Sequence, residues 1–449
     1  MSLVEQQIPE GYKRTEIGII PNNWSNMPLR SVLKESPKYG INAAAVPLQG
    51  DLPVYIRITD ITEDGYFKPT ETVGVNNPFS NLYKLSNGDI ALARTGASVG
   101  KSYLYRESDG ELVYAGFLIK VSPNTEMLNP EFLFHYLKTE QYWAWVIVNS
   151  MRSGQPGING NEYGSLLIPI PHIEEQTAIA TALSDVDALL TELESLIAKK
   201  QAIKTATMQQ LLTGKTRLPQ FATYTEGTAK GKRKGTKPSE LGEIHEDWDV
   251  VSFGELFEQS ISRKSLKADM TTTFVGMQDV SESARLIKQS PVNTSKVKSG
   301  FTYFERDDVL VAKITPCFEN GKGCHTKQLD TEHGFGSTEF HVLRAKLKAD
   351  SDFIYFWTTR EIFRQELESE MVGSAGHRRV PFSALQNYKI PCPDSKEEQT
   401  AIATILSDMD NEIQTLEQRL AKTRQIKQGM MQQLLTGRIR LPFEQAKEA

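Results

Sequence analysis

The stretch that most resembles a catalytic motif is TGASVGKS, residues 95–102. A phosphate-binding P-loop needs a glycine, four residues and then Gly-Lys-Ser/Thr, because its backbone amides and the helix that follows surround the phosphates. Here the spacing is one residue short, Thr95 stands where the first glycine belongs, and KSYLYRE reads as a strand. We therefore predict no nucleotide site. We expect a glycine-rich connection between strands, with Arg94 and Lys101 directed at an anionic partner.

A second motif, Asn77-Pro78-Phe79, lies one proline short of the Asn/Asp-Pro-Pro-aromatic motif that holds a flipped adenine in amino-methyltransferases. No glycine motif for S-adenosylmethionine follows a strand anywhere in the chain. The segment is therefore interpreted as a turn.

Metal binding is suggested by Cys317, Cys324, His325 and His333. The gap between the cysteines is longer than the usual Cys-x2-4-Cys of a zinc knuckle, so we expect packed or surface side chains and no metal site. No Ser/His/Asp set or carboxylate pair stands out, and no catalytic residue is assigned.

What remains is a set of polar loops at corresponding places in the two halves of the chain. Basic, hydroxyl and amide side chains are those that contact base edges and phosphates, although each alone is more often an ordinary solvated residue. The candidate contacts are Arg94, Thr95, Ser98, Lys101, Ser102, Arg152 and Gln155 in the first half, and Lys313, Thr315, Asn320, Lys322, His377, Arg378 and Arg379 in the second.

An internal repeat organises the elements that must position these loops. Residues 174–219 and 397–442 are identical at 28 of 46 positions, and an Ile-Pro-x-Pro segment precedes each. The preceding parts repeat faintly, since EIG before Trp24 matches ELG before Trp248. The chain is therefore two tandem half-chains, each a globular part followed by the repeated segment.

The repeated segments are predicted helices, because their apolar residues alternate at spacings of four and three. The helix over about 175–213 would be roughly 58 Å long. We expect the two helices to pair with each other; the alternative is that each seam packs on its own globular part. The seam residues are Ile179, Leu183, Val186, Leu190, Leu193, Ile197, Ile402, Leu406, Met409, Ile413, Leu416 and Leu420.

The globular parts mix short apolar runs, broken by Gly, Asn and Pro, with a helix in each, so the predicted fold class is α+β. The domains expected are a first globular part at 1–167, a central helix at 168–219, a basic linker at 220–239, a second globular part at 240–389, and a helix and tail at 390–449.

Composition limits the function classes. The 449 residues carry 51 basic and 56 acidic side chains, a net charge of -5, so bulk positive charge does not attract polyanions to this chain. Three cysteines cannot build a disulfide framework, and neither a signal peptide nor a long apolar stretch is present, so we expect a cytoplasmic protein.

With its doubled EEQTAIAT, LSDxD, MQQLLTG and RLP segments, the Ile-Pro-x-Pro approaches and the ITPCFENGKG stretch, the chain resembles the specificity (S) subunits of type I restriction-modification systems. The resemblance covers essentially the whole chain. It implies two target recognition domains, each reading one half of a bipartite site in double-stranded DNA, and an antiparallel coiled coil that sets the distance between the halves.

The resemblance also implies partners and a non-catalytic role. Two methyltransferase subunits and restriction/translocase subunits would bind the chain, and S-adenosylmethionine, ATP and magnesium would be held by those partners, with no cofactor in this chain. The alternatives are a specificity subunit serving a fused restriction-methylation polypeptide, a coiled-coil scaffold that homodimerises without DNA, and an enzyme acting alone.

Overall fold

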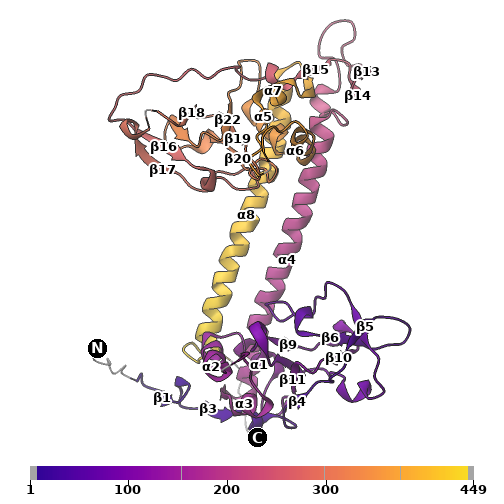
Figure 1. The fold of residues 1–449 in the computed structure, drawn as a ribbon, viewed down its shortest axis with the longest axis vertical. Coiled ribbons are helices and arrows are strands. Elements are labelled where there is room, and N and C mark those ends of the chain that lie inside the picture. The colour runs from indigo at the N-terminus through magenta and orange to yellow at the C-terminus, as the bar shows by residue number, and fades with distance from the viewer. Residues whose placement is uncertain (1–7, 153, 298, 375, 443–449) are drawn as a thin grey trace. The chain divides into compact units, whose positions relative to one another are not determined.

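The computed structural model describes residues 8–152, 154–297, 299–374 and 376–442. The chain divides into two compact units, Met1–Glu194 with Gln418–Ala449, and Ser195–Glu417. Each unit holds one globular module together with a portion of each of two long helices (Figure 1). The α+β class predicted from the sequence is confirmed for both modules.

The first module is built on two four-stranded sheets. One contains β10, β6, β7 and β5 in that order, and the other β4, β11, β8 and β9. A hairpin precedes them, and β3 pairs with β12. The strands are β1 (Tyr12–Thr15), β2 (Gly18–Pro21), β3 (Ser25–Pro28), β4 (Lys38–Tyr39), β5 (Ala45–Pro47), β6 (Val54–Ile56), β7 (Val73–Val75), β8 (Ile90–Ala93), β9 (Ser102–Leu104), β10 (Leu112–Tyr114), β11 (Leu118–Val121) and β12 (Leu167–Ile170).

Three short helices complete this module: α1 (Pro130–Tyr136), α2 (Glu140–Ser150) and α3 (Gly160–Ser165). Helix α1 begins where the sequence predicts, because the Asn129 side chain accepts hydrogen bonds from the backbone amides of Glu131 and Phe132, and Pro130 occupies the first helical position. The strand β8 is buried at all four residues, so it lies between packed layers and fixes the start of the loop that follows it.

The second module repeats this plan. Its sheets have the orders β17-β16-β21-β18 and β20-β19-β22, and β15 pairs with β23. The elements are β13 (Thr236–Ser239), β14 (Gly242–His245), β15 (Trp248–Ser252), β16 (Thr271–Val275), β17 (Ser290–Asn293), β18 (Thr302–Glu305), β19 (Val309–Ala312), β20 (Gly323–His325), β21 (His333–Gly336), β22 (Phe340–Leu343), α5 (Ser351–Thr359), α6 (Glu361–Glu368), α7 (Phe382–Asn387) and β23 (Lys389–Pro393).

The strand registers match between the modules. Ile90 of β8 lies opposite Leu104 and Val121, and Val309 of β19 lies opposite His325 and Leu343. The loops that follow β8 and β19 therefore leave equivalent sheets at equivalent points, as the faint repeat predicts.

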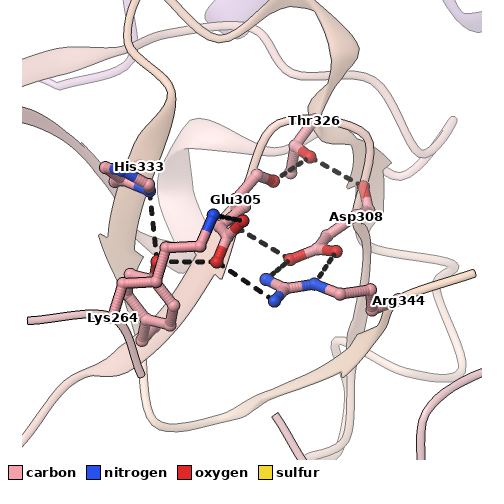
Figure 2. A network of polar contacts seen from close by, with 7 residues as sticks. Lys264, Glu305, Asp308, Thr326, His333 and Arg344 are labelled. Carbon is pink, nitrogen blue, oxygen red and sulfur yellow. Dashed lines mark hydrogen bonds and ion pairs between the residues drawn. The ribbon is translucent and has the colours of Figure 1, made fainter. Parts of the chain in front are cut away.

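A buried aspartate precedes each of these strands, at Asp89 and Asp308. In the second module, Asp308 accepts two hydrogen bonds from Arg344, at 2.8 and 2.7 Å, within the network of Figure 2. Burial raises the pKa of Asp308 and outweighs the opposing effect of Arg344. The Asp308–Arg344 pair ties the start of β19 to the residue after β22, at the opposite end of the strand from the loop that follows β19.

The predicted linker at 220–239 is not a free tether. Thr223 and Arg233 form an isolated antiparallel bridge, Lys234 pairs with Asp247 at 2.7 Å, and β13 begins at Thr236. The boundary predicted after residue 239 therefore lies inside the β13–β14 hairpin. Lys237 also pairs with a carboxylate, that of Asp249, whereas Lys230 and Lys232 are exposed.

The long helices are α4 (Ile173–Leu212) and α8 (Lys396–Leu434). Within the first unit, Asp187 pairs with Lys427, and Glu194 with Arg424 at 2.5 Å. As the residue number rises along α4, the number of its partner on α8 falls, so the portions of the two helices in this unit are antiparallel.

In the second unit, Lys200 pairs with Glu412 and Lys204 with Asp410, at 2.6 and 2.5 Å, again with opposite directions. The pairing predicted from the heptads is therefore confirmed within each unit, with the antiparallel direction that the resemblance implies.

The seam residues are buried or half-buried. Those in the first turns of each helix also pack on a module. Ile179 and Leu183 share one core with Phe132 of α1 and with Leu434 at the end of α8. Leu406 shares the other core with Leu211. Helix–helix pairing and packing on a module, the two arrangements considered from the sequence, therefore both occur. The first turns of each helix contact a module and also the end of the other helix. In the described part of the chain, no helix is long and apolar enough to cross a membrane.

Candidate nucleic-acid interface

Two loops meet in the first module, residues 94–101 after β8 and residues 151–157 after α2. The Gly96 amide donates to the Pro156 carbonyl at 3.0 Å, and the Ile158 amide donates to the Arg94 carbonyl at 2.9 Å. Thr95 and Gly157 form a β-bridge. The candidates that the sequence separates by more than fifty residues are thus brought to one surface, which we call the first loop pair.

The second module builds the same arrangement from residues 313–322 and 372–380. The Thr315 amide donates to the Arg378 carbonyl at 2.9 Å, and the Val380 amide donates to the Lys313 carbonyl at 2.8 Å. Ile314 and Arg379 form the equivalent bridge. We call this the second loop pair. The correspondence predicted between the loops of the two halves is confirmed by these backbone contacts.

The P-loop-like segment is a tight strand connection. It contains a single 3-10 turn, Gly96–Ser98, and passes directly into β9 at Ser102, as predicted. Gly100 has a φ of +90°, and a Cβ there would lie 2.8 Å from a methyl of Val146, so only glycine fits. The Tyr142 hydroxyl donates to the Gly100 carbonyl at 2.6 Å. No helix opens after this loop, so the segment lacks the geometry that a P-loop requires.

Most candidate cations face carboxylates. The ion pairs are Lys101–Glu63 at 2.7 Å, Arg152–Glu162 at 2.5 Å, Arg378–Glu368 at 3.2 Å and Arg379–Glu339 at 2.8 Å. The Arg379 pair is bidentate, and the hydrogen bonds from Arg379 lower the pKa of Glu339. An incoming phosphate must therefore compete with these carboxylates.

Among the polar candidates, the Thr315 hydroxyl donates to Glu319 at 2.7 Å, and the Asn320 amide donates to Glu282 at 3.0 Å. Gln155 and His377 are exposed, whereas Thr95 and Ser98 are half-buried.

Three candidates do not present their polar groups freely. Ser102 is only 5% exposed, because all three residues of β9 are buried, so its side chain is removed from the set. The Lys101 ammonium donates to the Ile61 carbonyl at 3.3 Å, and the Lys322 ammonium to the Met277 carbonyl at 3.3 Å. Both lysines connect their loop to the turn beneath it, a role that their position next to glycine did not indicate.

The Cys/His residues have structural surroundings. Among the described residues, no group of three or more His, Cys, Asp or Glu side chains could hold a metal ion. Both ring nitrogens of His325 are engaged, one accepting from the Lys327 amide and the other contacting Ser351 at 3.0 Å. Burial raises the pKa of the Cys324 thiol to about 12, so this cysteine stays protonated at neutral pH.

The segment Asn77-Pro78-Phe79 is a turn, as predicted. The Phe79 amide donates to the Asn77 side chain at 2.9 Å, which closes an Asx turn.

Sequence reasoning missed Tyr39. Its ring lies under the guanidinium of Arg94, with 4.7 Å from Cζ to the ring centroid, and its hydroxyl accepts from the Gly160 amide at 3.0 Å. Tyr39 belongs to the two-residue strand β4, which pairs with β11. No local pattern marks such a short strand, so its aromatic residue could be found only in the folded module.

Known proteins resemble this chain over most of its length. The family model for the type I restriction modification DNA specificity domain matches residues 20–205 and 245–425. A putative type I restriction enzyme MjaX specificity subunit of Methanocaldococcus jannaschii is 24% identical over 442 residues, covering 96% of this chain and 97% of that protein. The MjaVIII specificity subunit of the same organism is 25% identical over 424 residues, covering 87% of this chain and 92% of that protein.

A crystal structure of a type I restriction-modification system S subunit from M. genitalium shares the fold. It superposes with a TM-score of 0.54 at 16% identity and covers 92% of this chain and 96% of that one. The two matched regions coincide with the two module-and-helix halves and together span most of the sequence. The chain therefore belongs to the family of type I restriction modification DNA specificity domain proteins.

Proposed function

We propose that this chain is the DNA-recognition subunit of a type I restriction-modification system, and that each module reads one half of an asymmetric, bipartite site. One observation carries the proposal: the first and second loop pairs have the same backbone arrangement, but they present different side chains. The same backbone contacts present Arg94, Thr95 and Gln155 in one module and Lys313, Thr315 and Arg379 in the other. Two equivalent scaffolds with different contact residues suit two different half-sites.

The chain acts without catalysis of its own in this proposal. Methyltransferase subunits, two per chain, supply S-adenosylmethionine chemistry, and restriction/translocase subunits use ATP and magnesium. An asymmetric adaptor lets two identical methyltransferases each act on one half-site. The broken P-loop geometry of residues 95–102 supports the view that nucleotide chemistry belongs to the partners.

The charge of the chain supports dependence on partners for phosphate contacts. The net charge is -5, and four of the candidate cations form ion pairs with carboxylates. Each neutralised phosphate adds to affinity and to its salt dependence. We therefore expect the isolated chain to bind DNA weakly and to lose that binding steeply as salt rises.

The test is to map methylated adenines in DNA from cells that express this chain with its methyltransferase partner. The expected result is a single asymmetric motif of two specified halves separated by an unspecified gap. Methylation at one continuous palindrome, or none above the level of the methyltransferase alone, would contradict the proposal. Light scattering of the isolated chain separates the remaining alternative, because a DNA-independent scaffold would form a stable homodimer.

A further inference from the structure

Arg94 differs from Lys101, Arg152, Arg378 and Arg379 because it has no acidic partner, and from the lysines Lys313 and Lys322 because its cation lies over an aromatic ring. Among the described residues, no carboxylate oxygen lies within 4.0 Å of its guanidinium, and its Nε is buried without a hydrogen-bond partner. Its contact is with the Tyr39 ring, at 4.7 Å from the centroid. A planar cation stacked on an aromatic ring keeps its charge and most of its donors uncommitted.

Backbone hydrogen bonds to neighbouring segments hold both residues of the stacked pair, Arg94 and Tyr39. The Arg94 amide donates to the Phe117 carbonyl at 3.0 Å, and its carbonyl accepts from Ile158 at 2.9 Å. The Tyr39 hydroxyl accepts from the Gly160 amide at the start of α3. The backbone of Arg94 and the ring of Tyr39 are therefore held in place before any ligand arrives, and the contact with that ring orients the guanidinium, which reduces the entropy lost on binding.

The equivalent residue of the second module is Lys313, at the same place in the backbone hydrogen-bond pattern. No aromatic ring lies against its ammonium among the described residues. An ammonium acts as a point charge and suits phosphate, whereas a pre-oriented guanidinium matches the O6 and N7 acceptors of guanine in the major groove. The two modules thus differ in chemistry at one equivalent point.

We propose that Arg94 reads a guanine in the half-site of the first module and that Tyr39 is the positioning residue that orients it. The proposal rests on the function proposed above and names the first base contact within it. A bidentate arginine predicts a position at which guanine is required and at which the other three bases are rejected.

The experiment uses the complex of this chain with its methyltransferase partner and a duplex containing the mapped site. Arg94→Met is expected to weaken binding on the order of 10- to 100-fold, with the loss confined to one guanine position. Replacing that guanine by 7-deazaguanine, which removes the N7 acceptor, should weaken the unmodified complex strongly and the Arg94→Met complex little. A first half-site that contains no guanine would overturn the proposal.

A uniform loss of affinity across all sequences would also overturn it, because this outcome means that Arg94 contacts phosphate. Unchanged binding would do the same. These outcomes differ from failure of the proposed function, in which the unmodified complex itself methylates no bipartite site.

Tyr39 is tested with a conservative and a disruptive variant. Tyr39→Phe keeps the ring and should retain discrimination at the guanine, whereas Tyr39→Leu should lose most of it while the other positions of the half-site are still read. Equal behaviour of the two variants would contradict a positioning role for the ring. The matched control is Arg106→Met, which removes another arginine stacked on rings of the first module, Tyr66 and Phe134, outside the loop pair. It should leave the discrimination unchanged.

Discussion

Two arginines, one after each long helix, secure the helix ends to the modules. Arg217 donates to Glu398 at 2.7 Å and to Asp247 at 2.6 Å, and its side chain is 6% exposed. Arg440 donates to Glu175 at 2.7 Å, and the Trp24 indole donates to the same carboxylate at 3.0 Å. The repeated RLP and EEQT segments are thus each other's partners, which explains why both recur in the two halves.

The first prediction concerns the Arg217 network. Arg217→Met leaves the Glu398 carboxylate buried without its cation, so the free energy of unfolding should fall by about 3 kcal/mol or more. Urea denaturation followed by circular dichroism measures this. Arg424→Met provides the comparison, because the Arg424–Glu194 pair is exposed at both side chains and should cost no more than about 1 kcal/mol. Equal losses in the two variants would show that burial does not set the effect.

The second prediction concerns His135 of α1. Burial, aided by the neighbouring cations Lys138 and Lys427, lowers its pKa to about 3. An unfolded histidine takes up its proton near pH 6.5, so the folded protein should lose stability as the pH falls from about 6.5 toward 3. At pH 5 this one group accounts for about 2 kcal/mol. His135→Gln should flatten the dependence of the urea midpoint on pH between 6.5 and 5, whereas His377→Gln, at an exposed site, should not.

At the scale of elements, the ends and the middle of each long helix have different surroundings. The first turns of α4 contact the first module and the end of α8, and the first turns of α8 contact the second module and the end of α4. Residues between these ends, such as Leu193, Ile197 and Ile413, are buried between the helices but belong to neither module's core. The middle of each helix is therefore free to change length, whereas its ends are not.

The third prediction follows from this difference. Inserting seven residues, one heptad, after Lys200 of α4 and after its partner Glu412 of α8 should lengthen the gap between the half-sites without altering either half. Mapping methylated adenines in cells that express the variant measures the gap. The same insertion beside Gly227, in the segment that joins α4 to β13, should leave the gap unchanged. An unaltered gap in the helix variant would mean that helix length does not set the spacing.

At the scale of the whole molecule, each module has its own cores, its own buried aspartate at Asp89 or Asp308, and its own loop pair. Every contact that shapes one loop pair comes from the same module. Each loop pair is therefore shaped within its own module, although the main core of each module also includes the ends of both long helices.

The fourth prediction is that exchanging the second module for the corresponding module of another specificity subunit changes one half of the methylated motif only. The exchange should begin before Thr236, because the β13–β14 hairpin starts there and a cut at 240 would divide it. Sequencing methylated DNA from the two strains compares the motifs. A change in both halves would contradict independent reading.

The sequence by itself determined the tandem organisation, the long helices and the correspondence of the loops. The first and third follow from the residues that the two halves share, and the helices follow from heptad spacing. Both can be read directly from the order of residues in the chain. The helix start at Asn129-Pro130 is equally local, since its cap lies within three residues of the groups it satisfies. Such features are predictable because each depends on neighbours in the sequence.

Only the tertiary structure decided which loop residues are available. It buried Ser102 within β9, gave Lys101 and Arg379 carboxylate partners, and placed Tyr39 beneath Arg94. Each of these outcomes depends on residues far apart in the chain that meet through sheet register and loop packing. A list of basic residues in loops therefore could not separate the neutralised cations from the one that is stacked and free of a carboxylate, because that difference arises from contacts made in three dimensions.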